Sequence, residues 1–287
     1  MFRLAAFDKA RFVEPAGEPA LVPPDSVSWR MFKNPVTLFI GGVAAVILEL
    51  AEPAVRTGVW EHTDFRRDPM RRLERTGVAA MITVYAARSV AEPMIAGVVR
   101  MHDRVEGVTP AGEPYRANDP KLLRWVQATA AYGFIEAYSR YGRTLTLAEI
   151  DQAYAEGAPA ASLYGAHDTP RSDAERQALF DAMRQRLEPS PILFEFLGIM
   201  RAAPIAPWPL RPVQRLLIRT AVELTPDWVR ERLCLDDRFG LRPWQRPLVR
   251  LLGALADRVV LPFSPAVQSC RRLGLPAGHL YRRRGTG

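Results

Sequence analysis

The sequence predicts an all-α fold, a single mainly helical domain whose helices pack around a cavity in the style of a globin. Apolar residues recur at helical spacing along most of the chain, and no alternating strand pattern of useful length appears. With 287 residues and 48% hydrophobic content, the chain can bury a large core. Its 25 prolines favour helix starts and stiff connections, and no internal repeat is visible.

The expected helices follow from this periodicity and from helix-start signals. Asn34, Asp68 and Asp119 each precede a proline, which is the pattern of an N-cap followed by proline in the first turn. The pair Gly41-Gly42 indicates either a very close packing contact or a helix junction. The predicted helices are residues 37–49, 53–59, 69–83, 93–106, 120–141, 146–155, 173–187, 191–200, 213–222, 226–233 and 243–260.

The domain organisation is expected to be simple. Residues 1–28 are interpreted as an extended lead-in, and residues 29–287 as one helical domain. The proline-rich stretch 203–212 is the one candidate boundary, and we interpret it as a surface crossing within that domain.

The net charge of +8 comes almost entirely from scattered arginines. A nucleic-acid groove would need basic residues gathered on one face with stacking aromatics, and no such stripe is legible, so nucleic-acid binding is not expected. Arginines can instead bind carboxylates, including those of a haem.

Cysteine usage and the N-terminus bear on cofactor type and location. Cys234 and Cys270 lack a C-x-x-C-H context, which excludes a covalently attached c-type haem. Two cysteines in a long chain favour a reducing compartment. The first twenty residues show no signal-peptide pattern, and the most apolar window, 36–50, is too short to span a membrane. A cytoplasmic protein is therefore expected.

His102 is the residue of most chemical interest. It lies in a predicted helix with Pro93 in the first turn and Gly107 as its stop. Neighbouring apolar residues at helical spacing direct the imidazole inward; these are Met94, Ile95, Val98, Val99 and Val105. A neutral imidazole binds iron or zinc well, and one histidine without further ligands suits a haem better than a bare ion. The alternative is a histidine that is only packed in the core.

Short motifs follow His102 in a fixed order. The chain reads His102-x-x-Val-x-Gly, then Tyr115-x-Ala-x-Asp-Pro, then Trp125-Val126. Upstream lie the Gly-Gly pair, the segment Gly58-Val-Trp-Glu-His-Thr-Asp-Phe65 and the motif Asp68-Pro-x-x-Arg-x-x-x-Thr76. In this order the chain resembles the rubber oxygenase (latex-clearing protein) and mpaB oxygenase superfamily, mainly between residues 34 and 156.

This resemblance implies a helical fold that holds a non-covalent haem b, with His102 as the axial ligand of its iron. It also implies that Arg72 and Thr76 line the haem pocket. The two share one helix face, so both side chains can reach one cavity. The arginine can hold a propionate or polarise bound dioxygen, and the hydroxyl can donate to it.

Several positions depart from the family pattern or leave alternatives. Arg75 stands where rubber oxygenases carry a lysine that can cap the iron, and arginine is a poor ligand because it stays protonated. The family's pocket glutamate corresponds to Glu49 or Glu52. His62 either lines the pocket beside the haem or anchors its loop. Gln127 stands where histidine is usual.

Two functions are consistent with these residues. The first is a haem-dependent oxygenase in which Arg72, Thr76 and Arg75 steer dioxygen at the iron toward an apolar substrate, such as an unsaturated or isoprenoid chain. The second is a protein that binds haem or an apolar ligand without turnover. A helical module in which His102 is only packed would bind no haem at all. Oligomeric state does not follow from the sequence.

Overall fold

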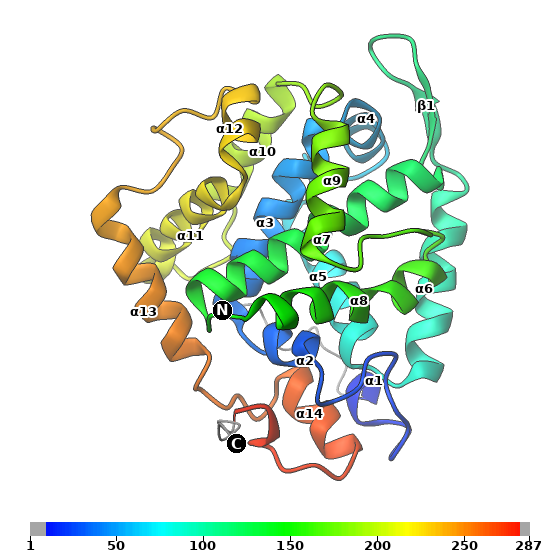
Figure 1. Ribbon diagram of the computed structural model, residues 1–287, viewed down its shortest axis with the longest axis vertical. Coiled ribbons are helices and arrows are strands. Elements are labelled where there is room, and N and C mark those ends of the chain that lie inside the picture. The colour runs from blue at the N-terminus through cyan, green and yellow to red at the C-terminus, as the bar shows by residue number, and fades with distance from the viewer. Residues whose placement is uncertain (1–9, 282–287) are drawn as a thin grey trace.

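Two long helices, α3 (Pro35–Ala51) and α7 (Pro120–Tyr141), cross at the centre of the molecule (Figure 1). This computed structural model describes residues 10–281, and its mainly helical architecture confirms the all-α prediction. The remaining helices are α1 (Ala10–Val13), α2 (Val27–Phe32), α4 (Pro53–Glu61), α5 (Pro69–Tyr85), α6 (Arg88–His102), α8 (Leu147–Leu163), α9 (Asp173–Met183), α10 (Pro191–Ala202), η2 (Trp208–Leu210), α11 (Arg211–Leu224), α12 (Asp227–Arg232), η3 (Pro243–Gln245), α13 (Arg246–Ala256), α14 (Pro265–Arg272) and η4 (His279–Tyr281).

The crossing of α3 and α7 is a contact between two backbones. A Cβ atom added to Gly133 would lie 2.3 Å from the carbonyl oxygen of Gly41, and one added to Gly41 would lie 2.6 Å from that of Gly133. Only glycine permits such an approach. Because α3 runs unbroken through this point, the Gly41-Gly42 pair is a packing contact rather than a helix junction.

The predicted helix starts at three Asx-Pro pairs are confirmed. The side chains of Asn34, Asp68 and Asp119 accept hydrogen bonds from backbone N–H groups in the first turns of α3, α5 and α7. Each proline occupies the first turn, where its missing N–H costs no helical hydrogen bond.

The predicted helix around His102 has different limits. Helix α6 begins at Arg88 rather than at Pro93, so this proline lies inside the helix, and it ends at His102. The earlier start is fixed by tertiary contacts, since the Arg88 N–H donates to the carbonyl of Pro19. Gly107 is not a helix stop but belongs to β1 (Glu106–Val108), which pairs antiparallel with β2 (Pro114–Arg116). Strands of three residues are too short to give an alternating pattern in the sequence, and the hairpin leaves the mainly helical prediction intact.

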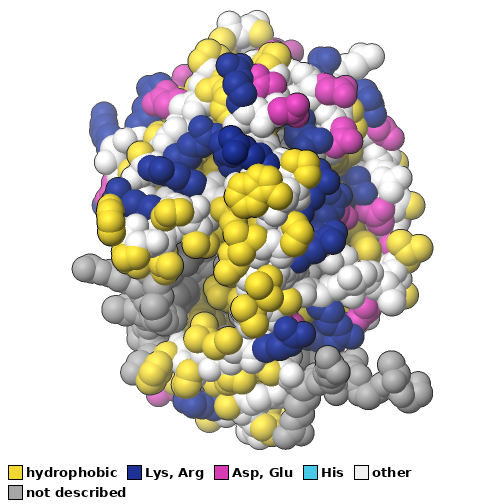
Figure 2. Space-filling model, turned by 90° about the vertical axis from the view of Figure 1, so that its left-hand side faces the viewer, with side chains coloured by type: hydrophobic (Ala, Val, Ile, Leu, Met, Phe, Trp, Pro, Cys, Tyr) yellow, Lys and Arg dark blue, Asp and Glu magenta, His cyan; other side chains and the backbone are white. Residues whose placement is uncertain are grey.

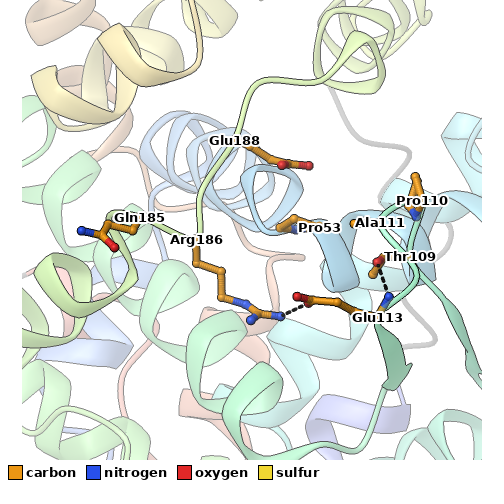
Figure 3. A pocket seen from close by; sticks show the side chains of 8 residues that line it. All are labelled: Pro53, Thr109, Pro110, Ala111, Glu113, Gln185, Arg186 and Glu188. Carbon is orange, nitrogen blue, oxygen red and sulfur yellow. Dashed lines mark hydrogen bonds and ion pairs between the residues drawn. The ribbon is translucent and has the colours of Figure 1, made fainter.

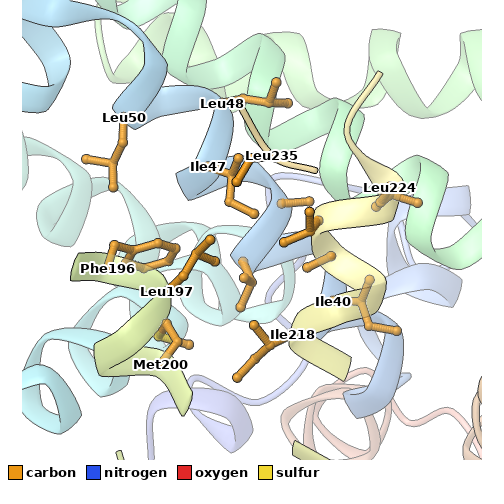
Figure 4. Close-up of a cluster of buried hydrophobic side chains, with 14 of the residues drawn as sticks. Ile40, Ile47, Leu48, Leu50, Phe196, Leu197, Met200, Ile218, Leu224 and Leu235 are labelled. Carbon is orange, nitrogen blue, oxygen red and sulfur yellow. The ribbon is translucent and has the colours of Figure 1, made fainter. Parts of the chain in front are cut away.

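The main core lies between α3, α7, α10 and α11. Figure 4 shows Ile40, Ile47 and Leu50 of α3 facing Phe196 of α10 and Ile218 of α11. The same cluster contains buried side chains before and after the proline-rich stretch 203–212. That stretch is thus a crossing within one domain.

The N-terminal residues pack against the C-terminal part of the chain (Figure 1). Phe12 of α1 is fully buried, and Arg272 of α14 donates hydrogen bonds to the carbonyl oxygens of Phe12 and Tyr85. Residues 10–28 of the expected lead-in are therefore part of the packed structure, and residues 1–9 lie outside the described chain.

No single helix between residues 10 and 281 has both the length and the apolar character needed to cross a membrane. Helices α3 and α4 meet that test only as a pair, with a bend of 109° between them.

The glycine contact yields the first prediction. Gly133→Ala would force the backbones of α3 and α7 apart, and we expect a loss of about 2–3 kcal/mol in unfolding free energy. Gly157→Ala is the matched control, because Gly157 lies in α8 with no atom near its added Cβ, and alanine there should stabilise by up to about 1 kcal/mol. Urea unfolding of both variants measures the effects. Equal stability of the two variants would contradict a tight crossing.

Candidate functional site

Helices α5 and α6 pack side by side but leave much of their apolar surface uncovered. On α5 only Ile82, Val84 and Tyr85 are buried, and on α6 only Ala91 and Ile95. Apolar side chains on both helices stay partly exposed, namely Leu73, Val78, Met81, Met94, Val98 and Val99. Leu73, Val78, Met81 and Met94 also pack against buried clusters, so the apolar surface that the two helices leave open is the exposed part of these side chains together with that of Val98 and Val99.

His102 lies at the C-terminal end of α6, beside this surface. Its side chain is partly exposed, yet its Nδ1 atom is fully buried and makes no hydrogen bond with any described residue. The accessible edge of the ring is thus the one that carries Nε2. Burial lowers the pKa of His102 below its usual value, and the positive charge of Arg72 lowers it further. The imidazole is accordingly neutral near pH 7.

Asn118 lies next to the buried edge of the imidazole and raises the pKa of His102. Its amide nitrogen donates to the carbonyl of Val99 at 3.1 Å and to Oδ1 of Asp103 at 2.6 Å. Both donors are thereby used, which fixes the orientation of the amide. Its Oδ1 is left buried without a partner within residues 10–281, as is Nδ1 of His102. An acceptor and a potential donor without other partners therefore lie side by side.

Arg72 on α5 is close enough to Glu49 on α3 for each to shift the pKa of the other. Burial raises the pKa of Glu49 to about 7, although Arg72 opposes that rise. Burial also lowers the pKa of Arg72, as does the charge of Arg75. Glu49, Arg72 and His102 thus form one electrostatically coupled group drawn from three helices.

Thr76 and Arg75 lie on the same part of α5. The Thr76 hydroxyl donates to the carbonyl of Arg72 at 3.0 Å, so its proton is engaged within the helix. The guanidinium of Arg75 lies 3.7 Å from the sulfur of Met101, the residue before His102. Both side chains are exposed. The structure therefore brings Arg72, Arg75 and Thr76 to the end of α6 that carries His102.

His62 lies apart from this group. It caps the C-terminal end of α4, and its exposed ring packs edge-on against Tyr115 of the hairpin, with 6.5 Å between ring centroids. This contact joins the end of α4 to the hairpin, and which of the two roles considered from the sequence His62 takes stays a prediction.

The structure separates the two glutamates that the sequence left as alternatives. Glu52 is fully buried, accepts a hydrogen bond from the N–H of Val55, and pairs with Arg186 at 2.7 Å. It is therefore a helix cap and an ion-pair partner. Glu49 has no such partner in the described structure, and it is the glutamate that faces Arg72.

A family model for the catalytic domain of the ER-bound oxygenases mpaB and B′ and of rubber oxygenase matches residues 29–258. The chain belongs to this family. No curated protein and no solved structure matches it. As a member of an oxygenase family, the chain carries an enzyme's catalytic domain, for which dioxygen and a small-molecule substrate are the expected reactants. The matched residues contain the whole group from Glu49 to Asn118.

A separate pocket of about 400 Å³ lies between the α3–α4 corner, the hairpin and the segment that follows α9 (Figure 3). Its polar walls are joined by ion pairs, because Arg186 also contacts Glu113 at 3.3 Å. Arg56 pairs with Glu188 beside it at 2.5 Å. None of the predicted site residues of this oxygenase-family chain lines the pocket. We interpret the pocket as a space between loops that these ion pairs hold together.

Other metal-binding arrangements are absent from the described part of the chain. No three His, Cys, Asp or Glu side chains in residues 10–281 gather closely enough to hold an ion. The cysteines are not paired with each other, and burial raises the pKa of Cys270 to about 11, which keeps it a thiol.

The raised pKa of Glu49 makes a prediction about stability. The folded chain holds this proton up to about pH 7, whereas the unfolded chain releases it near pH 4.5. The stabilisation by the neutral carboxyl is complete below pH 4.5 and is lost as the pH rises through 7. Glu49→Gln should therefore be about 1–3 kcal/mol more stable than the parent at pH 8 and nearly equal at pH 4.5.

Thermal unfolding of the full chain at both pH values measures this difference. Glu74→Gln, at an exposed position of α5, is the control and should change neither value. If Glu49→Gln were no more stable than the parent at pH 8, the carboxylate of Glu49 would have to be well solvated.

Proposed function

We propose that this chain is a haem b-dependent oxygenase in which Nε2 of His102 would bind the haem iron. The observation that carries the proposal is the environment of this imidazole. One ring nitrogen is buried beside an amide oxygen without a partner, and the other edge of the ring faces outward beside uncovered apolar helix surface.

The residues present fit a haem. A neutral imidazole offers a lone pair for iron, and burial together with Arg72 keeps His102 neutral. The uncovered apolar faces of α5 and α6 suit the porphyrin plane. Arg72, the positive charge next to His102, can pair with a propionate or with an anionic oxygen.

Asn118 acts as a positioning residue in this proposal. If Oδ1 of Asn118 accepts the Nδ1 proton of His102, the imidazole is held in the tautomer whose Nε2 is free to bind iron. Iron- and zinc-binding histidines almost always donate their other N–H in this way, and the partner also orients the ring. Asp103 completes the arrangement, because it fixes the amide that fixes the ring.

The remaining residues supply charge and proton transfer. Haem, when bound, would supply the dioxygen-binding iron and its redox chemistry. The guanidinium groups of Arg72 and Arg75 can donate hydrogen bonds beside His102. The Thr76 hydroxyl already donates its proton to the carbonyl oxygen of Arg72, so only its oxygen is left, as an acceptor. Glu49, with a pKa of about 7, can accept or release a proton at neutral pH. The partly exposed apolar side chains of α5 and α6 favour an apolar substrate, such as an unsaturated or isoprenoid chain.

The decisive test of haem binding is the visible spectrum of the purified chain. We expect a Soret band near ~410 nm that shifts on reduction with dithionite. His102→Ala should reduce the haem-to-protein ratio about tenfold or more, and added imidazole should restore part of the band. His167→Ala, at an exposed loop histidine, is the matched control. Undiminished haem in His102→Ala would overturn the assignment.

Oxygen consumption separates the two functions considered from the sequence. A haem- or apolar-ligand-binding protein without turnover would show the same spectrum but consume no dioxygen with an unsaturated chain as substrate. The oxygenase should consume dioxygen and lose this activity in His102→Ala.

The role of Asn118 has its own test. Asn118→Leu removes the acceptor, and we expect haem affinity to fall about tenfold because the ring is no longer oriented. Asn118→Asp keeps an acceptor and adds negative charge, so haem should be retained while the reduction potential falls. Haem titration and spectroelectrochemistry measure both effects. An unchanged potential in Asn118→Asp would show that residue 118 does not contact the ligand histidine.

A further inference from the structure

Helix α13 turns an apolar face to the outside of the molecule. Leu248, Leu251 and Leu255 are 43%, 55% and 50% exposed, and the face continues with Trp244 before the helix and Val259 after it, at 65% and 52%. The three leucines are three and four residues apart and share one face of α13, and Trp244 and Val259 extend this spacing beyond the two ends of the helix. We call these five residues the α13 stripe.

The fold fixes this orientation. On the opposite face, a Cβ added to Gly253 would lie 2.0 Å from the carbonyl oxygen of Tyr141, at the end of α7. The carbonyl of Gly253 accepts a hydrogen bond from the buried Asn34 side chain, and Val249 is fully buried. The helix is thus attached through a narrow face of small residues and cannot rotate to bury its leucines.

The charge of residues 238–256, which carry most of the stripe, has one sign. Four arginines and no acidic residue lie between positions 238 and 256. Arg246 pairs with Glu223 and Arg238 with Asp236, whereas Arg242 and Arg250 have no carboxylate partner among the described residues. Figure 2 shows this face with hydrophobic side chains down its middle and dark blue arginines beside them, while acidic side chains lie mostly toward its upper and right-hand parts.

Helix α11, which packs against α13, adds further positive charge. It carries Arg215 and Arg219, which lie close enough to Arg201 of α10 to lower the pKa of that arginine, in addition to the effect of burial. A buried Nη2 atom of Arg201 has no hydrogen-bond partner in the described chain. Three arginines gathered without a carboxylate between them favour an anionic partner.

We propose that the α13 stripe lies on the surface of a lipid bilayer that contains anionic lipids. The leucines and Val259 would enter the boundary of the acyl chains, and Trp244 would lie at the level of the headgroups. The flanking arginines would contact lipid phosphates. An apolar face with an aromatic residue and cationic flanks is the pattern of helices that lie in the membrane interface.

Charge complementarity favours this occupant over a second copy of the chain. A two-fold contact through the stripe would bring the same surface of each copy together, so arginines would face arginines. Of the carboxylates that flank the segment, Asp236 pairs with Arg238 at 2.6 Å and Asp257 with Lys33 at 2.8 Å, which leaves Asp237 alone to face the arginines of a second copy. A surface of lipid phosphates provides the opposite charge.

Vesicle co-sedimentation of the purified full chain tests the proposal, and its readout does not depend on haem or on turnover. Vesicles of phosphatidylcholine with 30% phosphatidylglycerol are compared with vesicles of phosphatidylcholine alone. We expect about tenfold or greater preference for the anionic vesicles, weakened by high salt. The variant Leu251→Glu with Leu255→Glu should lose about tenfold or more in binding. Leu147→Glu is the control, because Leu147 is 77% exposed on α8.

A second double variant, Arg242→Gln with Arg250→Gln, keeps the apolar stripe and removes charge. It should reduce the preference for anionic vesicles while leaving binding to neutral vesicles unchanged. Absence of binding to anionic vesicles by the parent chain would overturn the proposal. So would a concentration-dependent dimer in sedimentation velocity that Leu251→Glu abolishes, since this would assign the stripe to a second copy.

Discussion

The backbone contact between Gly41 and Gly133 is the constraint on which the rest of the structure depends. It holds α3 and α7 closer than any side chain would allow, and both helices reach the candidate site from that fixed crossing. Helix α3 carries Glu49 near its C-terminal end, and Asn118 lies just before the first turn of α7. The relative positions of the carboxyl group and the amide thus follow from a contact that involves neither residue.

Arg72 determines how the neighbouring groups ionise. Its positive charge favours the ionised form of Glu49 and opposes protonation of His102, while burial opposes charge on both. At neutral pH the result is a neutral imidazole, a glutamate near its midpoint and one cation without a direct ion-pair partner in the described chain. Such a group can bind an anion through Arg72 while Glu49 exchanges a proton, and both capacities would serve the haem-dependent oxygenase that we propose.

The sequence could predict the features that depend on local chemistry. The Asx-Pro caps, the helical class and the ordered motifs around Arg72 and His102 need only a few neighbouring residues. The features that the sequence did not predict depend on contacts between residues far apart in the chain. Pro93 lies inside α6 because Pro19 fixes an earlier start. Asn118 is an unassigned position of its motif in the sequence, and its place beside His102 arises because the hairpin returns the chain to Val99. Glu49 and Glu52 differ only because the α3–α4 corner turns Glu52 into a cap.

The α13 stripe shows a related limit, because periodicity finds an apolar face but not the direction in which it points. Full burial of a leucine side chain contributes about 2 kcal/mol, so three half-exposed leucines forgo about 3 kcal/mol, which is a large share of the stability of a domain. A chain selected only to fold would gain by turning this face inward. Instead the close approach of Gly253 to Tyr141 fixes the helix, and the leucines remain accessible beside the unpaired Arg242 and Arg250. This arrangement is most simply explained by a surface that binds them after folding, and the single sign of the flanking charge indicates an anionic one.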